Sequence, residues 1–507
     1  MNRMIHSLRL LMLLICSLLM LNTVNAQQEK PNILMICIDD LNDWTGFLGG
    51  HPQALTPNMD ELASRGVNFT NAHCPAPGCS PSRNAILFGI EPHNSGLYPF
   101  YRINNVAPGI LESYTPLPKL LRFNGYTTCG ISKVWHNPDS SYRKNEQWDE
   151  YRFYHDNEMN LLREKGYWPN PMKTALQNVP ASNPITDFDD YKSAMHAVDF
   201  LGREHDKPFL LAVGFIFPHT PLNAPLENWE RFSEPIELLP ILANDLSDIP
   251  LAGQSNVQVT LEAQLRRDDA WEDIYRAYLA CTNFTDDNVG RVLDALAASG
   301  YMDNTIVILW SDHGFQMGAK RSLSKFTLWN ESTRVPFIIW DARSQDGNGQ
   351  TYDEPVGLID IYKTICELAD LPTPSYVDGG SLVPWLENPG LARERPAMTT
   401  WGRGNYSLRF KDWRYTRYFD GSEELYAEDC DFNEWTNLAD RPRYSALKQE
   451  LAKWLPGFEA PQVATGIDYY EVADADAPER KILTFKEAVR KYNEEKLLPP
   501  LGIDYAE

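Results

Sequence analysis

Asn32-Ile33-Leu34-Met35-Ile36-Cys37-Ile38, followed immediately by Asp39-Asp40, sets the architecture of this chain. The run is almost continuously apolar, which is typical of a β-strand that is buried on both faces. Such a strand belongs to a sheet that carries helices on both sides. Because the run stops at two carboxylates, the sequence also predicts that polar side chains gather where this strand ends.

Similar apolar runs alternate with helical patterns along most of the chain. This alternation predicts an α/β fold with a large, mostly parallel sheet sandwiched by helices. The predicted strands are residues 126–131, 209–216, 305–310 and 335–340, and the predicted helices are residues 58–65, a segment from about Ser82, residues 188–204 and about 261–298.

Side chains that can bind a metal or transfer a proton follow three of the predicted strands. Asp39-Asp40 comes after the first strand, His219 after residues 209–216, and Asp312-His313 after residues 305–310. In open α/β sheets, sites lie beyond the carboxyl ends of the strands. We therefore expect these residues to lie at one edge of the sheet.

The pattern changes from about Ala397. Residues 407–410, 413–418 and 424–426 alternate between apolar and polar side chains, with turn signals between them. They predict a smaller C-terminal subdomain with an antiparallel sheet, followed by a helix at about 444–454. The predicted organisation is a catalytic domain at 27–395, an α+β subdomain at 396–460 and an unassigned extension at 461–507.

The N-terminal sequence has the pattern of an export signal. Arg3 and Arg9 flank a short apolar run, which ends in Val24-Asn25-Ala26. This predicts a signal peptide at residues 1–26 and a periplasmic or secreted protein. An uncleaved anchor is the alternative, but the run is short for a membrane span. No later run is long and apolar enough, so no membrane insertion is expected.

Charge and cysteine content narrow the function classes further. The formal net charge of −23 over 507 residues disfavours nucleic acid and anionic membranes as partners. The eight cysteines are scattered without a CxxC pair, so no disulfide framework is assigned. Cys37 and Cys366 lie in apolar runs and are expected to be buried thiols.

The most specific motif is Cys79-Ser80-Pro81-Ser82-Arg83, continuing to Gly89. Alone it is also compatible with a structural cysteine beside a helix start. With the other motifs, residues 30 to 440 resemble the type I sulfatases of the alkaline-phosphatase superfamily. The sequences of residues 38–43 and 133–136 are most similar to those of the iduronate-2-sulfatase branch.

The resemblance implies a modified nucleophile and a metal. Cys79 would be oxidised by a maturation enzyme to formylglycine, whose hydrate attacks sulfur with one hydroxyl and releases sulfate through the other. Asp39, Asp40, Asp312 and His313, together with the modified Cys79, would bind Ca²⁺; carboxylate oxygens suit a hard cation. Histidine at position 313, where asparagine is commoner, favours the iduronate branch. For Asp39-Asp40 alone, a solvated strand-end turn remains the other interpretation.

Further catalytic roles follow from the same resemblance. Arg83 would orient the nucleophile, Lys133 would hold sulfate oxygens, and His136 would remove a proton from the hydrate. His219 and Lys325 would contact sulfate and assist the leaving group. Either could donate the proton, Lys325 if a nearby cation lowered its pKa.

Three functions remain open at this point. The leading one is a calcium-dependent sulfatase that acts on a sulfated carbohydrate, such as an oligosaccharide from a polysaccharide. The second is a phosphodiesterase or phosphonate monoester hydrolase of the same superfamily, although one Asp pair and one Asp-His pair favour a single metal. The third is a catalytically inactive protein that binds sulfated glycans.

Overall fold

The computed structural model describes residues 30–98, 113–136, 146–154, 181, 183–257, 261–262, 265–266, 269–344, 348–463 and 475. The predicted signal peptide, residues 1–26, and nearly all of the predicted C-terminal extension lie outside the described residues. Among the helices that the structure does describe, none combines the length and apolar character needed to cross a bilayer.

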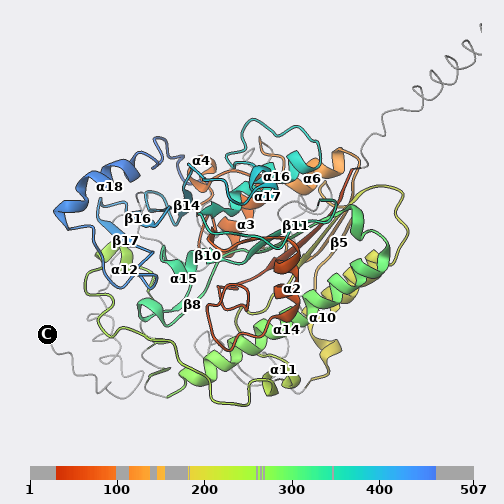
Figure 1. The fold of residues 1–507 in the computed structure, drawn as a ribbon, viewed down its shortest axis with the longest axis horizontal. Helices are drawn as coiled ribbons and strands as arrows, with labels where there is room; N and C mark the ends of the chain where they lie inside the picture. Colours follow the sequence, from red (N-terminus) through yellow and green to blue (C-terminus); the bar gives the residue numbers. More distant parts are fainter. Residues whose placement is uncertain are drawn as a thin grey trace, which may run out of the picture.

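A large sheet forms the centre of the molecule (Figure 1). Its strand order is β12-β2-β11-β7-β1-β6-β4-β5. β1 pairs in parallel with both β6 and β7, and β4 pairs in parallel with β5 and β6, whereas β11 runs antiparallel to β7 and β2. The strands are β1 (Asn32–Ile38), β2 (Val67–Phe69), β4 (Thr127–Ser132), β5 (Glu150–Arg152), β6 (Phe209–Gly214), β7 (Thr305–Ser311), β11 (Phe337–Asp341) and β12 (Thr351–Tyr352).

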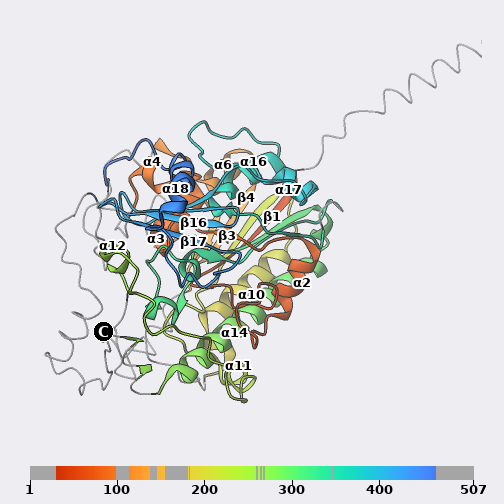
Figure 2. The same ribbon diagram turned by 60° about the vertical axis from the view of Figure 1, so that its left-hand side comes forward.

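Helices cover both faces of this sheet, as the apolar β1 segment predicts (Figure 2). Ile33, Met35 and Cys37 pack in one core with residues of α3 (Cys79–Phe88), α6 (Leu117–Phe123) and α16 (Ile361–Leu368). Leu34, Ile36 and Ile38 pack in a second core with α2 (Pro57–Arg65), α10 (Asp189–Leu201) and α14 (Trp271–Ser299). Alternate side chains of one strand therefore anchor two separate helical layers.

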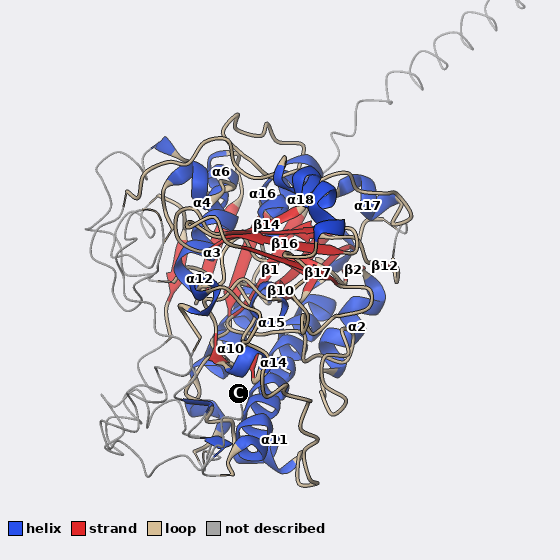
Figure 3. Cartoon of the chain, turned by 90° about the vertical axis from the view of Figure 1, so that its left-hand side faces the viewer, coloured by secondary structure: helices blue, strands red, loops and turns tan. Residues whose placement is uncertain are grey.

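The C-terminal subdomain is a four-stranded antiparallel sheet (Figure 3). Its strands are β14 (Ala397–Thr400), β15 (Tyr406–Phe410), β16 (Trp413–Arg417) and β17 (Glu423–Ala427), and α18 (Ser445–Ala452) follows. β14 had not been predicted, because its four residues carry no clear alternation. The predicted fold class, a large mostly parallel sheet with a small antiparallel sheet near the C-terminus, is confirmed.

Short elements connect these layers. β3 (Ala72–His73) pairs with β10 (Arg334–Val335) and β13 (Val356–Gly357), and β8 (Gln316–Met317) pairs with β9 (Leu323–Ser324). The remaining short helices are α4 (Pro92–Ser95), α11 (Leu226–Glu230), α12 (Leu251–Gln254), α15 (Asn330–Thr333) and α17 (Val383–Glu387), and the 3₁₀ turns are residues 185–187, 302–304, 319–321, 358–360 and 442–444.

Three predicted elements differ in their bounds. The long helix predicted from about residue 261 is interrupted: residues 261–262 and 265–266 are helical, but Asp269 has a left-handed backbone (φ 53°) and α14 begins at Trp271. α3 begins at Cys79 rather than near Ser82, since Pro81 lies within its first turn, where no backbone N–H is needed. The strand predicted at 335–340 is divided at Pro336 into β10 and β11.

A carboxylate from a distant helix caps the N-terminus of α2. Thr56, the residue before α2, makes no side-chain capping bond. Asp286 of α14 takes this role instead, accepting hydrogen bonds from the backbone N–H groups of Met59 at 2.8 Å and Asn58 at 3.1 Å. The side-chain amide of Asn58 adds a third bond at 2.8 Å. This cap ties α2 to α14 across the helical layer.

Replacing this cap should destabilise the fold. In Asp286→Ala the first N–H groups of α2 lose their acceptor, so the free energy of unfolding should fall by about 1–3 kcal/mol. Asp294→Ala removes an exposed carboxylate from the same helix and should change it by less than about 0.5 kcal/mol. Urea unfolding followed by circular dichroism measures both. Equal losses in the two variants would contradict the capping role.

Candidate active site

The residues predicted for chemistry converge at the carboxyl ends of four neighbouring strands. β4, β6, β1 and β7 are adjacent in the large sheet, and each leads into one of the predicted segments. The segments are Lys133 to His136 after β4, His219 after β6, Asp39 and Asp40 after β1, and Asp312 and His313 after β7, joined by Cys79 at the start of α3 and Lys325 just after β9.

Cys79 lies at the centre of this cluster. Its side chain is 1% exposed, and it is the first residue of α3. Its Sγ is 3.1 Å from Lys325 Nζ and 3.2 Å from His313 Nε2, and His136 also hydrogen-bonds to it. Burial raises the pKa of the Cys79 thiol, but Lys325, Lys133 and His313 outweigh burial and hold it well below its usual range. The positive end of α3 acts in the same direction.

Arg83, one helical turn along α3, is fully buried and joins the two strands that lead into the predicted metal ligands. Its Nε donates to Asp312 Oδ2 at 2.7 Å, and its Nη2 lies 3.4 Å from Asp39 Oδ1. The guanidinium also donates to the carbonyl oxygens of Ile38 at 3.3 Å and Val134 at 3.2 Å. Arg83 therefore fixes the ends of β1, β4 and β7 relative to the helix that carries Cys79.

Two buried lysines add to the positive charge that Arg83 brings to the site. Lys133 Nζ contacts Asp39 Oδ2, and Lys325 Nζ lies 2.5 Å from Asp40 Oδ1. Burial lowers the pKa of Lys325, but Asp40 and Cys79 outweigh it and raise that pKa well above the usual value. Both lysines therefore face the carboxylates and the nucleophile as cations, and these carboxylates oppose the lowered Lys325 pKa that proton donation would require.

His219 stands on the more open side of the cluster. Its side chain is 30% exposed, and its Nε2 is 4.0 Å from Asp40 Oδ2. Its Nδ1 lies 2.6 Å from the carbonyl oxygen of Thr220, so Nδ1 carries a proton and donates it to that carbonyl. The Nε2 atom is thus the one turned toward the cluster, where a leaving oxygen could approach it.

Four of the five predicted metal ligands form one compact group. One ligand atom from each of Asp39, Asp40, Cys79 and His313 lies within 4.8 Å of the others, and all four residues are buried. Asp40 Oδ2 has no hydrogen-bond partner among the described residues. His313 donates through Nδ1 to Gly314 O at 2.9 Å, so Nε2 is the ring nitrogen that faces the group. An orphaned carboxylate oxygen and an oriented imidazole suit a divalent cation.

The fifth predicted ligand, Asp312, adjoins this group with its oxygens already engaged. Its Oδ2 binds Arg83, while its Oδ1 accepts the backbone N–H groups of Asp40 at 3.2 Å and His313 at 3.0 Å. Burial outweighs Arg83 and raises the pKa of Asp312 to about 7. A metal role for Asp312 stays a prediction; what it does in this structure is orient two of its neighbours.

Sequence reasoning missed one residue that shapes the site. Asp190, buried in the first turn of α10, accepts the backbone N–H groups of Ile216 at 2.8 Å and Phe217 at 2.9 Å. These bonds hold the segment that leads to His219. No local pattern signals this role, because an acidic residue in the first turn of a helix looks like an ordinary partner of the helix dipole.

The Sulfatase family model matches residues 31–371, from the start of β1 to the end of α16. This chain belongs to the sulfatase family. It is therefore a sulfuric ester hydrolase, and the resemblance inferred from its motifs is confirmed.

Relatives that each cover more than two thirds of this chain are sulfatases as well. A sulfatase of Formosa agariphila is 34% identical over 85% of this chain and 88% of its own. The Δ4,5-hexuronate-2-O-sulfatase of Bacteroides thetaiotaomicron is 29% identical, covering 89% and 93%. The iduronate 2-sulfatase of Mus musculus is 28% identical, covering 69% and 70%.

A solved structure from another activity class shares the fold. The phosphonate monoester hydrolase of Agrobacterium radiobacter superposes with a TM-score of 0.66 over 84% of this chain and 94% of its own, at 22% identity. This likeness concerns the architecture alone.

The metal group can be tested through its orphaned carboxylate. Asp40→Asn should weaken the binding of a divalent cation by at least about tenfold, because it removes a ligand charge from a buried site. Asp43→Asn is the matched control, since Asp43 lies in the same loop but pairs with Arg334 at 2.6 Å. Calorimetric titration of chelator-stripped protein measures both affinities. Unchanged binding in Asp40→Asn would show that the cation lies elsewhere.

Proposed function

We propose that this sulfatase removes sulfate from a sulfated carbohydrate, such as an oligosaccharide derived from a polysaccharide, and that Cys79 supplies the nucleophile. The observation that carries the proposal is the convergence of Lys133, Lys325 and His136 on a buried Cys79, with His219 4.0 Å from Asp40 of the neighbouring carboxylate group. Two cations and an imidazole around one nucleophile suit a reaction in which a sulfate ester is bound and an alkoxide leaves.

The names of the relatives support a sugar substrate. Two of them are a hexuronate-2-O-sulfatase and an iduronate 2-sulfatase. We therefore infer that oligosaccharides with 2-O-sulfated uronates are the first substrates to test. The negative charge of the whole chain does not oppose this choice, because the buried lysines and Arg83 make the site locally positive.

We propose that Cys79 is oxidised to formylglycine, so that Sγ in the unmodified chain stands in for the oxygens of the hydrated aldehyde. That group would supply a nucleophile with its own route for releasing sulfate. A formylglycine-generating or equivalent enzyme is then the maturation partner. Lys325 and His313, which already contact Sγ, would orient those oxygens.

A bound calcium ion completes the proposal. Asp39, Asp40, His313 and the modified Cys79 would hold it, with Asp312 beside them. When bound, such a cation would neutralise charge on the sulfate and on the nucleophile. Lys133 and Lys325 would then be freed, at least in part, from compensating the carboxylates and could bind sulfate oxygens.

The remaining side chains divide the proton transfers. His136, which hydrogen-bonds to Cys79, would accept a proton from the nucleophile. His219 would donate one to the leaving oxygen, because its Nε2 faces the cluster from the more open side. Lys325 is the poorer donor, since the surrounding carboxylates favour its charged form.

Export is part of the same proposal. Arg3, Arg9 and the apolar run that ends in Val24-Asn25-Ala26 support a cleaved signal and a periplasmic or secreted enzyme. An extracytoplasmic sulfatase would meet polysaccharide fragments before they are taken up.

Two alternatives can be separated from this function in one assay. A phosphodiesterase or phosphonate hydrolase would release product faster from aryl phosphonates or phosphodiesters than from the matched aryl sulfate. A catalytically inactive glycan-binding protein would release nothing from any of them. The proposed function requires sulfate release to dominate and to extend to a sulfated uronate oligosaccharide.

Cys79→Ser should abolish turnover while leaving the fold intact. A serine oxygen can attack sulfur, but it cannot expel the sulfate again, so steady-state release should fall by at least about a thousandfold. Ion chromatography of released sulfate measures turnover, and mass spectrometry of the peptide that contains residue 79 shows whether this residue is modified. Repeated turnover by the serine variant would refute the mechanism.

The two candidate acids should respond differently to the leaving group. His219→Ala should slow hydrolysis of a sugar sulfate by about a hundredfold or more, and that of nitrophenyl sulfate by much less, because nitrophenolate needs no proton. Lys325→Ala, which removes a cation from the sulfate site, should slow both substrates alike. Values of kcat/KM for the two substrates in each variant show which residue donates the proton. A selective loss in Lys325→Ala would exchange the roles.

A further inference from the structure

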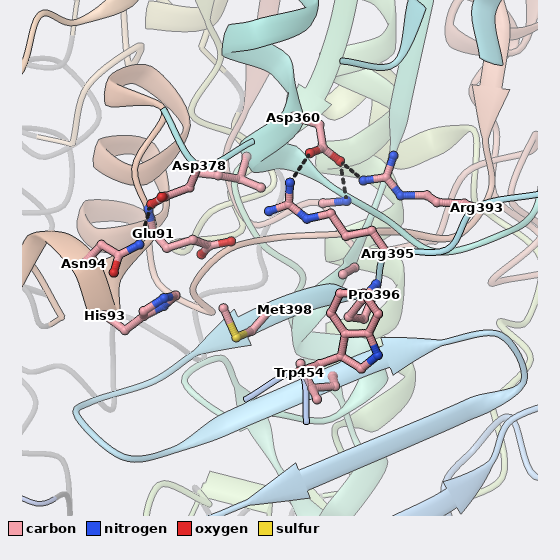
Figure 4. Close-up of a pocket in the computed structure, with 14 residues that line it drawn as sticks. Glu91, His93, Asn94, Asp360, Asp378, Arg393, Arg395, Pro396, Met398 and Trp454 are labelled. Atoms are coloured by element: carbon pink, nitrogen blue, oxygen red, sulfur yellow. Dashed lines mark hydrogen bonds and ion pairs between the residues drawn. The ribbon is translucent and has the colours of Figure 1, made fainter. Parts of the chain in front are cut away.

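A second polar cavity lies between α4, the loop before β14 and the end of α18 (Figure 4). Its volume is about 200 Å³. None of the residues proposed for catalysis or metal binding lines it, so it is distinct from the active site. Its lining combines Glu91, His93 and Asn94, the arginines Arg393 and Arg395, the carboxylates Asp360 and Asp378, and the apolar Met398 and Trp454.

Two buried polar atoms in this cavity lack a partner. Glu91 and His93 are 3% and 8% exposed, yet Glu91 Oε2 and His93 Nδ1 have no hydrogen bond to any described residue. Figure 4 shows the carboxyl group of Glu91 pointing into the space between α4 and the arginines. A buried polar atom left unpaired costs about 1–3 kcal/mol. Two such atoms in one cavity indicate that a polar ligand satisfies them.

The fixed charges around the cavity are balanced. Asp360 binds Arg393 at 2.6 Å and lies 4.0 Å from Arg395. Asp378 accepts the backbone N–H of Glu91 at 2.8 Å and the side-chain amide of Asn94 at 2.9 Å. With two arginines and two hydrogen-bonded carboxylates around the cavity, the opposite charges are equal in number and neither an anion nor a cation is favoured.

Glu91 adds a neutral donor rather than a charge. Burial raises its pKa to about 8; Arg395 opposes this increase and Asp378 adds to it. The carboxyl group therefore carries a proton near neutral pH and can both donate and accept. The cavity therefore presents both hydrogen-bond donors and acceptors, a combination that is typical of sites that recognise hydroxyl groups.

The rim of the cavity offers an aromatic surface. Trp454, just after α18, is 46% exposed and lines the cavity beside Met398. An indole ring half open to solvent beside polar groups suits the apolar C–H face of a sugar ring. A ligand with hydroxyl groups along its edge and an apolar face satisfies both halves of the lining.

We propose that this cavity binds one uncharged pyranose residue, outside the catalytic centre. The proposed carbohydrate substrate matters here only as the source of that residue, which would be an unsulfated sugar of the same polymer. Binding at this second point would hold a glycan on the enzyme while its sulfated end is processed.

The test uses unsulfated sugars and the full-length protein. Methyl β-glucopyranoside, methyl β-galactopyranoside, methyl β-xylopyranoside and methyl α-rhamnopyranoside are offered one at a time in saturation-transfer NMR. At least one should receive transfer from the parent protein. Trp454→Ala and Glu91→Leu should reduce that transfer at least fivefold. Glu91→Leu should also melt no lower than the parent, because it removes an unpaired polar group.

Two control variants locate the binding. Phe458→Ala removes an exposed aromatic ring from the same C-terminal segment, outside the cavity, and should leave the transfer unchanged. Lys325→Ala alters the catalytic centre and should also leave it unchanged. Loss of transfer in Lys325→Ala, its persistence in Trp454→Ala, or no transfer to any of the four sugars would overturn the proposal. Stronger cavity-dependent transfer to methyl β-glucuronide would overturn its uncharged character.

None of these outcomes depends on sulfate release. A protein that binds the methyl glycosides but cleaves no sulfated uronate would retain this site and refute the proposed substrate. A protein that cleaves the oligosaccharide but binds no methyl glycoside would support the proposed substrate and refute the sugar site in this cavity.

Discussion

Three carboxylates buried side by side at the ends of β1 and β7 govern the construction of this enzyme. Isolated charges of one sign cannot remain in a dry interior, so Asp39, Asp40 and Asp312 require cations at contact distance. Arg83 reaches them from α3, Lys133 from the end of β4 and Lys325 from beyond β9. Each pairing draws a different segment to the same edge of the sheet, and Cys79 is carried there with Arg83.

Much of this arrangement could be predicted, because its determinants are local in the sequence. The apolar run of β1 and the carboxylates that end it predicted both the buried sheet and the edge at which chemistry would lie. Parallel strands bring their carboxyl ends together, so His219 and Asp312 could be placed near Asp39 without any knowledge of contacts. The five-residue motif at Cys79 then narrowed the chemistry to one family.

What could not be predicted depends on partners far away in the chain. Glu91 looks like any acidic residue before a proline, and only the fold brings it between Asp378 and Arg395. Asp286 caps a helix 228 positions earlier, and no local pattern announces that pairing. A helix boundary was missed at Asp269 as well: its backbone is left-handed (φ 53°), although its neighbours have ordinary helical propensity.

The burial of Cys79 would limit the time in which the proposed oxidation of its thiol can take place. Its side chain is 1% exposed, and the groups that enclose it extend to Lys325, so the thiol is sealed only when that distant part of the chain has folded back. Assembly from widely separated segments is slow, and this delay would give the proposed maturation enzyme time to act. Once α3 has packed, no second protein can reach the sulfur. Under the proposed maturation, oxidation and folding would therefore compete, and a chain that folded first would keep an unmodified thiol and stay inactive.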